Sequence, residues 1–312
     1  MTRFAVARFL QGYAVLIMIV ILMTTLTAMS DSFLSAQNLL NILNQNAPLA
    51  IMAAAMTLVV IAGGFDLSVG AIFAMGAVVS AWVALHFDPV VGLLLAPFVG
   101  LLLGVVNGLV ITMLNVHSFL ATIATSLIFK GIAVVMSDGR LIPVRMDAFT
   151  WLGREKLGGV FVSIWVMLGF ALLLGFVLTR SSLGRQILAV GGNQEAAILS
   201  GIRANRIKVI TFAAAGFAAG LAASIATSRV SMGQASAGTG LELEAIAAVI
   251  LGGTSIYGGV GAVWRSIAGV MLLALINNGF NILNADPFYR DLTTGLIILA
   301  AIGVSASGKR AR

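Results

Sequence analysis

The chain has 312 residues, of which 60% are hydrophobic and only 9% are charged, and its mean hydropathy is +1.08. Soluble domains carry about a quarter charged residues, so the composition excludes a water-soluble enzyme and indicates one membrane-embedded domain over 1–312. The lack of cysteine excludes disulfides, thiolate catalysis and cysteine-based metal sites.

The net charge of +7 lies mainly in short loops between apolar runs. Cytoplasmic loops and contact with anionic lipid explain such clusters. No basic stripe with interleaved aromatic residues indicates nucleic acid as a partner. His86 and His117 lie far apart without metal-ligand spacing, so we interpret each as a residue at a helix end.

Apolar segments of helix length follow one another along the chain. The first follows Arg3 and Arg8 and exceeds the usual core of a secretory signal. We therefore expect a retained membrane helix, with cleavage near Ala28 and Ser30 as the alternative. The expected helices cover 12–30, 46–63, 67–86, 90–113, 118–137, 160–179, 208–229, 243–256, 262–283 and 290–306. These segments predict an all-α polytopic membrane protein of about ten transmembrane helices, with glycine-broken hairpins and a short, glycine-broken eighth segment.

The loops predict the orientation. Loop 180–208 carries five basic residues against one acidic residue, and both chain ends are basic, whereas loop 138–159 carries four basic and three acidic residues. Ten crossings place both termini and loop 180–208 on one side. The positive-inside rule makes that side cytoplasmic.

Glycines repeat on helix faces and recur as pairs. The stripes Gly100–Gly104–Gly108 and Gly216–Gly220 let helix backbones approach closely. We expect this packing inside one subunit, and a dimer seam is the alternative.

The glycine pairs lie in two similar hairpins. VVIAGGFDLSVGAIF holds Gly63 and Gly64, and AVILGGTSIYGGVGAVW holds Gly252 and Gly253. A parallel repeat of the kind found in transporters explains the likeness. Chance similarity of two glycine-rich hairpins is the alternative.

Asp66 lies in the first hairpin, between two very apolar runs. Its carboxylate is placed to accept the free N–H groups near Ser68 and Val69 and to meet the positive end of the third helix. A structural cap is one interpretation. A gate or coupling element is the other, because polar residues inside membranes are often functional.

Lys130 lies near the middle of the fifth helix and needs a partner or a water-filled cavity. Several amides are predicted to share that polar interior, either as a lining for neutral polyhydroxyl solutes or as hydrogen-bond contacts between helices. These amides are Asn107, Asn277, Asn278 and Asn281.

Loop 180–208 predicts a docking element. Asn193 is a good N-cap, Glu195 suits the first turn and Gly201 ends a short amphipathic helix over about 194–200. A capped helix in a basic loop suits contact with a partner protein. The residues expected at this contact are Asn193, Glu195, Ser200, Gly201, Arg203 and Arg206.

Energy-coupling and catalytic motifs are missing from the sequence. It contains no G-x-x-x-x-G-K-[ST] loop, and Lys309 lacks its spacing. It also lacks G-x-S-x-G and a plausible Ser/His/Asp arrangement. We therefore expect a solute pathway without its own enzyme activity or cofactor, driven by a separate chain.

These stretches resemble the ribose-type sugar permeases, the membrane subunits of bacterial ATP-binding-cassette importers, whose relatives include branched-chain amino acid permeases. The likeness spans nearly the whole chain and rests on AGGFDLSVGA, GVVNG, SLGRQILAVGGNQEAAILSGI and ELEAIAAVILGGTSIYGG. It implies import of a ribose-like sugar across the bacterial inner membrane. It also implies a second permease copy or paralogue, ATPase subunits that bind the ATP, and a periplasmic sugar-binding protein.

The sequence departs from this family at His117 and Ser118, where prolines are usual, at Lys130, where arginine is usual, and at Arg265. Three alternatives remain. One is an ion-coupled transporter, and the others are a branched-chain amino acid permease and a membrane scaffold without transport activity. The candidate ion ligands of the first are Asp66, Glu242 and Glu244.

Overall fold

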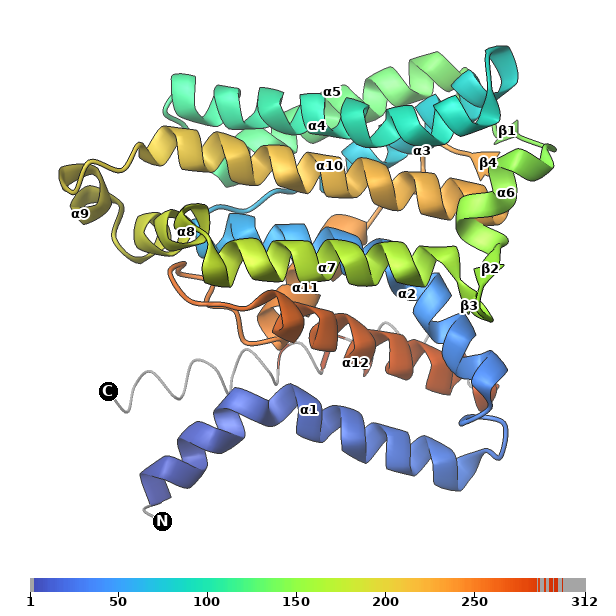
Figure 1. The fold of residues 1–312 in the computed structure, drawn as a ribbon, viewed down its shortest axis with the longest axis horizontal. Coiled ribbons are helices and arrows are strands. Elements are labelled where there is room, and N and C mark those ends of the chain that lie inside the picture. The colour runs from blue at the N-terminus through green and yellow to red at the C-terminus, as the bar shows by residue number, and fades with distance from the viewer. Residues whose placement is uncertain are drawn as a thin grey trace.

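The computed structural model describes residues 3–284 and the single positions 286, 289, 292, 293, 295, 296 and 299, with side chains from residue 13 onward. Its long helices lie roughly parallel in one bundle, to which shorter helices are added (Figure 1). They are α1 (Arg3–Met29), α2 (Ala36–Ile61), α3 (Val69–His86), α4 (Pro89–Met113), α5 (Ser118–Ser137), α6 (Asp147–Arg154), α7 (Val162–Arg180), α8 (Ser182–Gly192), α9 (Gln194–Leu199), α10 (Ala204–Val230), α11 (Leu241–Leu251) and α12 (Val263–Ile282). Two short antiparallel pairs join β1 (Ile142–Pro143) to β4 (Met232–Gly233) and β2 (Lys156–Leu157) to β3 (Val160–Phe161).

The predicted all-α membrane fold is confirmed. Seven of the described helices, α2, α3, α4, α5, α7, α10 and α12, are long and apolar enough to cross a bilayer. Helix α1 adds an apolar stretch, Tyr13–Met29. The expected eighth segment corresponds to α11, which ends at Leu251 rather than 256, and the expected tenth, 290–306, lies outside the continuously described residues.

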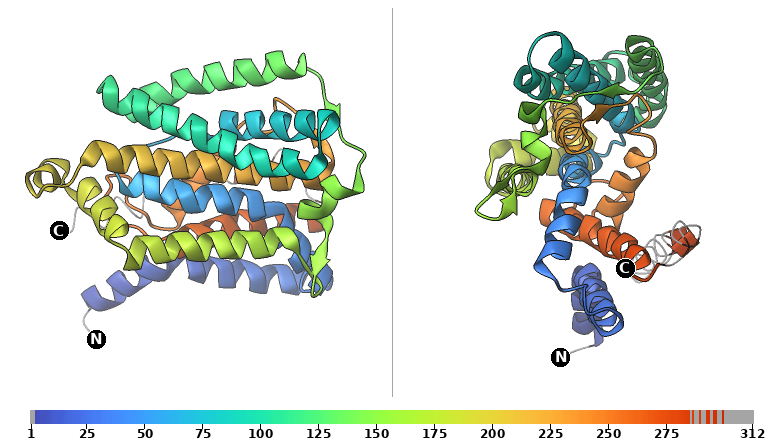
Figure 2. Two further views of the ribbon diagram at one scale, coloured as in Figure 1. Left: turned by 45° about the horizontal axis from the view of Figure 1, so that its top comes forward. Right: turned by 90° about the vertical axis from the view of Figure 1, so that its right-hand side faces the viewer.

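The two ends of the bundle differ (Figures 1 and 2). Helices α8 and α9 and the start of α1 lie at one end, here called the docking end. Helix α6 and the four short strands lie at the opposite end. This arrangement places loops 180–208 and 138–159 on opposite sides of the bundle, in agreement with the charge analysis.

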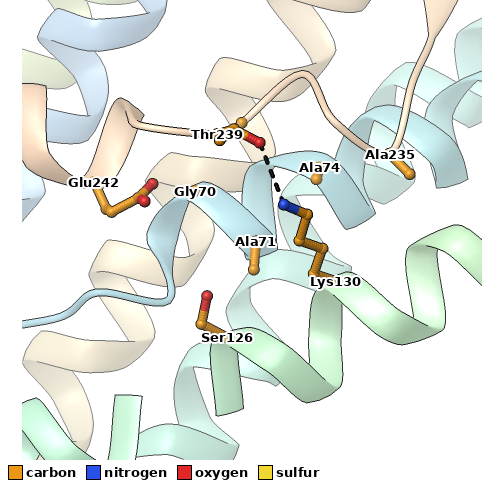
Figure 3. A pocket seen from close by; sticks show the side chains of 9 residues that line it. Gly70, Ala71, Ala74, Ser126, Lys130, Ala235, Thr239 and Glu242 are labelled. Atoms are coloured by element: carbon orange, nitrogen blue, oxygen red, sulfur yellow. Dashed lines mark hydrogen bonds between the residues drawn. The ribbon is translucent and has the colours of Figure 1, made fainter. Parts of the chain in front are cut away.

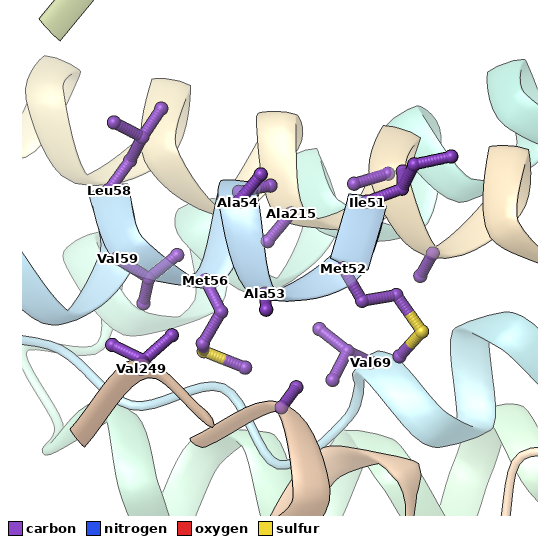
Figure 4. Close-up of a cluster of buried hydrophobic side chains, with 14 of the residues drawn as sticks. Ile51, Met52, Ala53, Ala54, Met56, Leu58, Val59, Val69, Ala215 and Val249 are labelled. Atoms are coloured by element: carbon purple, nitrogen blue, oxygen red, sulfur yellow. The ribbon is translucent and has the colours of Figure 1, made fainter. Parts of the chain in front are cut away.

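Helix α2 forms the centre of the core. In its apolar window 89% of the residues are buried, against 28% in α5. Its side chains pack against α3, α10 and α11, as Figure 4 shows for Met52, Met56, Val69, Ala215 and Val249. The helices around it expose apolar side chains, as expected of a bundle whose outer surface faces lipid.

Helix α2 begins ten residues earlier than predicted. The stretch 36–45 lies outside the predicted apolar segment and contains several amides, yet it is helical, and Ser35 caps it through the N–H of Asn38. Its polar side chains find partners on other elements: Asn38 pairs with Asn278 of α12, and Asn44 contacts Ser163 of α7. These contacts compensate for the burial of polar groups in this part of the bundle.

The glycine stripes of α4 and α10 pack against each other inside the chain. A Cβ built on Gly100 would lie 2.2 Å from the carbonyl oxygen of Gly216, and one on Gly104 would lie 2.3 Å from that of Phe212. A Cβ on Gly220 would meet the carbonyl of Ala96 at 2.2 Å. The stripes therefore form a contact within one subunit, and the dimer-seam alternative does not hold for them.

Candidate functional site

Two non-helical stretches of the chain enter the bundle before a helix begins. Segment 62–68 runs inward from the docking end (Figure 1), and its N–H groups at Phe65 and Leu67 donate to Ser118 and Thr122, one turn apart on α5. The hydroxyl of Ser118 is an acceptor that a proline at this position would lack. This departure from the family pattern therefore holds the segment in place.

Segment 231–240 enters from the opposite end. Gly233 packs beside Ala77 of α3, whereas Gly238 packs beside Gly70 at the start of α3. A Cβ on Gly238 would lie 1.8 Å from the carbonyl oxygen of Gly70, and α11 begins three residues later. The starts of α3 and α11 therefore meet inside the bundle, where unpaired N–H groups give helix N-termini partial positive charge.

A small pocket of about 50 Å³ lies where these two helix starts meet (Figure 3). The Lys130 ammonium extends from α5 and donates to the Thr239 hydroxyl at 3.5 Å. The Glu242 carboxylate reaches the pocket from α11 and packs against Gly70, where a Cβ would lie 2.0 Å from Oε2. The pocket lining consists of Gly70, Ala71, Ala74, Ser126, Lys130, Ala235, Gly238, Thr239 and Glu242.

The pocket offers complementary polar groups at short range. Lys130 donates hydrogen bonds, Glu242 accepts them, and the hydroxyls of Ser126 and Thr239 do both. Such a set suits a small solute with several hydroxyl groups, or one with both a positive and a negative charge.

Asp66, four residues before Gly70 in the chain, lies in a fully buried network. Its Oδ1 accepts the Ser68 backbone N–H at 2.9 Å and the Ser68 hydroxyl at 2.6 Å. The Asn107 amide of α4 donates to the same hydroxyl at 2.6 Å. Asp66 thus accepts the Ser68 N–H, one of the two expected from the sequence, whereas Val69 is not among its partners and α3 begins without a side-chain cap. Within the described part of the chain, Asp66 Oδ2 and Asn107 Oδ1 have no hydrogen-bond partner.

The candidate pathway amides do not share one cavity. Asn107 belongs to the Asp66 network. Asn278 exchanges two hydrogen bonds with Asn38, at 3.2 and 2.9 Å, and so joins α12 to α2. Asn277 is its partly buried neighbour on α12 and does not line the pocket beside Lys130. Asn278 therefore matches the interhelical alternative that the sequence left open.

The two glycine hairpins end their helices in the same way. Gly63 has φ +82, and the N–H groups of Gly63 and Gly64 return to Val60 and Val59. Gly253 also has φ +82, and the N–H groups of Gly253 and Thr254 return to Ile250 and Val249. Both are Schellman ends with glycine in the left-handed position. The second glycine pair begins one residue earlier relative to its helix end, with Gly252 as the C-cap.

The predicted docking helix is present as α9. Asn193 caps it by accepting the Ala196 N–H at 3.0 Å, Glu195 lies in the first turn, and Ser200 bonds back to the Ala196 carbonyl. Gly201 follows with φ +83. The helix projects from the docking end (Figure 2) and leaves Leu199 89% exposed.

The preceding part of loop 180–208 is also helical, which the sequence analysis missed. Helix α8 is capped by Ser181, whose hydroxyl accepts the Gly184 N–H. A pocket of about 390 Å³ lies between α8 and the start of α10, beside Gln186, Arg203 and Arg206. These groups make the docking end a basic surface with a projecting helix.

Of the residues that line the pocket, Lys130 was predicted from the sequence to lie in a polar interior, whereas Ser126, Thr239, Gly70 and Gly238 were not. The signal was the run SAGTG at 236–240, where consecutive small residues directly precede a helix. In the described residues, no three His, Cys, Asp or Glu side chains gather as metal ligands. His86 ends α3 and His117 caps α5, both at helix ends as expected.

Residues 38–302 match the model of the branched-chain amino acid transport system / permease component family. The chain belongs to this family. It is 37% identical over 306 residues to the ribose import permease protein RbsC of Haemophilus influenzae, covering 96% of this chain and 95% of the relative. It is 40% identical to RbsC of Bacillus subtilis over 285 residues, or 90% and 88% of the two chains.

The L-arabinose transport system permease protein AraH of Escherichia coli is 33% identical over 302 residues, covering 96% of this chain and 92% of that relative. No solved structure matches the chain. The family resemblance read from the sequence is confirmed. The chain is a multi-pass membrane permease.

Proposed function

We propose that the chain is the membrane subunit of an ATP-binding-cassette importer that moves a ribose-like sugar into the cytoplasm. Its likeness to ribose and arabinose import permeases over more than nine-tenths of its length carries this proposal. The sequence has no P-loop, so the energy comes from a separate ATPase that binds ATP and docks on α9. The chain itself performs no covalent chemistry.

The pocket beside Lys130 is the candidate pathway. Sugar hydroxyls donate to Glu242 and accept from Lys130, and the small lining residues leave room for a ring when the helices separate. Helices α3 and α11 begin there, so displacing their starts changes the width of the pocket. Asp66 and Ser68 hold the start of α3 against α4 through Asn107, which makes this network the candidate gate.

A second permease copy is part of the proposal. Lys130 is the thirteenth residue of the 20-residue α5 and is exposed on the single chain. A rise of 1.5 Å per residue places it about 18 Å along the helix, near mid-membrane. An ammonium facing hydrocarbon there is unfavourable. We therefore place a second copy over this face, enclosing a polar path between two Lys130 side chains.

The orientation follows the basic surface. The docking end faces the cytoplasm, where anionic lipid and the ATPase lie, and the start of α1 lies at that end. The α6 end faces the periplasm and receives the sugar-binding protein.

A branched-chain amino acid is the second candidate solute. The opposite charges of Lys130 and Glu242 match the carboxylate and ammonium of a zwitterion, and the family description names branched-chain amino acids. This candidate predicts that leucine, and not a neutral sugar, enters with the same ATP dependence.

The deciding experiment is purification of the tagged chain with its co-encoded proteins, followed by uptake into proteoliposomes. We expect a stoichiometric ATPase and ATP-dependent uptake of radiolabelled ribose or arabinose, with Lys130→Met reducing uptake and Lys130→Arg retaining it. Leucine uptake alone selects the second candidate. Uptake that persists without ATP and stops when the ion gradient is removed contradicts the proposal.

The docking role of α9 has its own test. We expect Glu195→Arg combined with Arg203→Glu to weaken ATPase co-purification and uptake together, because both charges lie at the exposed docking end. Glu155→Arg, at the opposite end, is the control. Unchanged association and uptake in the double variant contradict the docking role.

A further inference from the structure

We infer that three backbone segments form a junction that transmits movement of the docking helix α9 to the starts of α3 and α11. The segments are the carbonyl of Ile61, Gly191 of α8 and Gly258–Gly259. We call their contact the glycine junction. This inference rests on the proposed function, because it supplies the step between ATPase docking on α9 and opening of the pocket.

The carbonyl of Ile61 is the centre of the junction. It is one of the last four carbonyls of α2, which have no partner inside their own helix. The Schellman end at Gly63 and Gly64 pairs the carbonyls of Val60 and Val59 instead. Ile61 receives its hydrogen bond from the Gly259 N–H at 2.8 Å, across the bundle, in the loop between α11 and α12.

Helix α8 presses on the same carbonyl. A Cβ built on Gly191 would lie 1.6 Å from the Ile61 oxygen and 2.7 Å from the Gly259 nitrogen. A Cβ on Gly259 would lie 2.7 Å from the Gly192 Cα, and one on Gly258 would lie 2.7 Å from the Gly191 carbonyl oxygen. The three segments therefore meet backbone to backbone, with no side chain between them.

The junction connects the docking helix to both helix starts. Only Asn193 separates α8 from α9, so a shift of α9 moves Gly191 directly. On one side, Ile61 leads through segment 62–68 to Asp66 and the start of α3. On the other, Gly259 leads back along the 252–262 loop to α11, whose first turn carries Glu242.

Direct backbone contact explains why the movement is passed on. Long side chains at an interface change rotamer and absorb small displacements, whereas close-packed main chains transmit them. The Gly259–Ile61 hydrogen bond makes the two hairpins move together. The starts of α3 and α11 at the pocket then move together when α9 is displaced.

Neighbouring glycines of α8 give a matched test. Gly191→Ala places a methyl group on the Ile61 carbonyl, whereas a Cβ on Gly192 meets nothing within 4 Å. Alanine favours the helix equally at both positions. In proteoliposomes with the ATPase and the sugar-binding protein, we expect Gly191→Ala to lower uptake of ribose, or of arabinose where wild type prefers it, at least about tenfold.

The expected defect is uncoupling rather than misfolding. The Gly191→Ala complex should contain the ATPase in the wild-type ratio and hydrolyse ATP at its basal rate, but the loaded binding protein should no longer accelerate hydrolysis. Gly192→Ala should behave as wild type. Equal transport by the two variants contradicts the inference, and so does loss of the ATPase from the Gly191→Ala complex. Failure of the wild-type chain to bind an ATPase contradicts the proposed function instead.

Hydrogen exchange on the unmodified complex tests the junction without a substitution. A non-hydrolysable ATP analogue bound to the ATPase should change the protection of peptides 58–68 and 252–262 together. A peptide from the α4–α10 contact, such as 209–221, should stay constant. A change in the α9 peptide that reaches only one hairpin, or neither, contradicts the inference even if Gly191→Ala does not accumulate.

Discussion

Glycine serves opposite purposes in the α4–α10 contact and at the ends of α2 and α11. In the first, glycines such as Gly100 and Gly216 stay inside continuous helices and let two backbones touch. In the second, Gly63 and Gly253 take left-handed conformations that end α2 and α11. One arrangement joins two long helices along their length, and the other ends two helices in glycine turns, the first of which leads to the start of α3 at the polar pocket.

This difference indicates that the two regions have different roles, one in stability and the other in transport. The α4–α10 pair is a scaffold in which close packing resists displacement. The start of α3 is held by a few hydrogen bonds, which backbone N–H groups of segment 62–68 donate to Asp66, Ser118 and Thr122. Substitutions in the scaffold should therefore damage folding, whereas those at the helix starts should damage transport in a folded protein.

The largest effect is expected from Gly216→Leu in the scaffold. The new side chain would overlap the Gly100 carbonyl, which lies 2.2 Å from a Cβ at this position. We expect a loss of stability of about 3 kcal/mol, at the upper end of the usual cost of overpacking, seen as failure to accumulate as a monodisperse protein in detergent. Gly175→Leu on α7, where a Cβ meets nothing within 4 Å, is the control. Equal accumulation of both variants would show that the scaffold is looser than its contacts suggest.

Asp66→Asn should produce the opposite result. The amide keeps the shape of the carboxylate but loses the charge that the two Ser68 donors stabilise. We expect normal accumulation with uptake lowered at least about tenfold, which corresponds to ~1.4 kcal/mol. Asp88→Asn changes the same chemical group at the exposed N-cap of α4 and should transport normally. Near-normal uptake by Asp66→Asn would make this residue a structural cap only.

The smallest effect is expected from the Asn38–Asn278 pair. Asn278→Ala removes the donor to Asn38 Oδ1, while Asn38 Nδ2 keeps its bond to the Phe33 carbonyl. We expect a loss of stability of about 1–2 kcal/mol, with uptake within about twofold of wild type. Replacing both residues with leucine should restore part of the stability, since neither amide is then left unpaired. A greater than tenfold loss of uptake in a stable Asn278→Ala protein would assign this amide to the pathway.

Much of the fold was predictable because each transmembrane helix corresponds to a continuous apolar run in the sequence. The runs at 67–86, 90–113 and 118–137 match α3, α4 and α5 within two residues at each end. The start of α2 was wrong because its amides, such as Asn38 and Asn44, find partners on distant helices. A single segment of sequence does not show those partners.

The candidate site was predictable only in part. Lys130 and Asp66 were identified because a charge between apolar runs is costly and therefore conspicuous. Thr239, Gly70 and Gly238 carry no such signal, because small residues serve equally in turns, helix packing and pockets. The glycine junction was invisible for the same reason.

The sequence by itself determined that this chain is a multi-pass helical membrane permease with a short capped helix near 194–200. Hydropathy, loop charge, capping residues and the missing P-loop are local properties, and they are read without knowing which helices touch. Only the tertiary structure decided that the starts of α3 and α11 meet beside Lys130. It also decided that Gly191, Ile61 and Gly259 come together. These contacts join residues that are distant in the sequence through their backbone atoms. Because every residue has the same backbone, no pattern of side chains predicts such contacts.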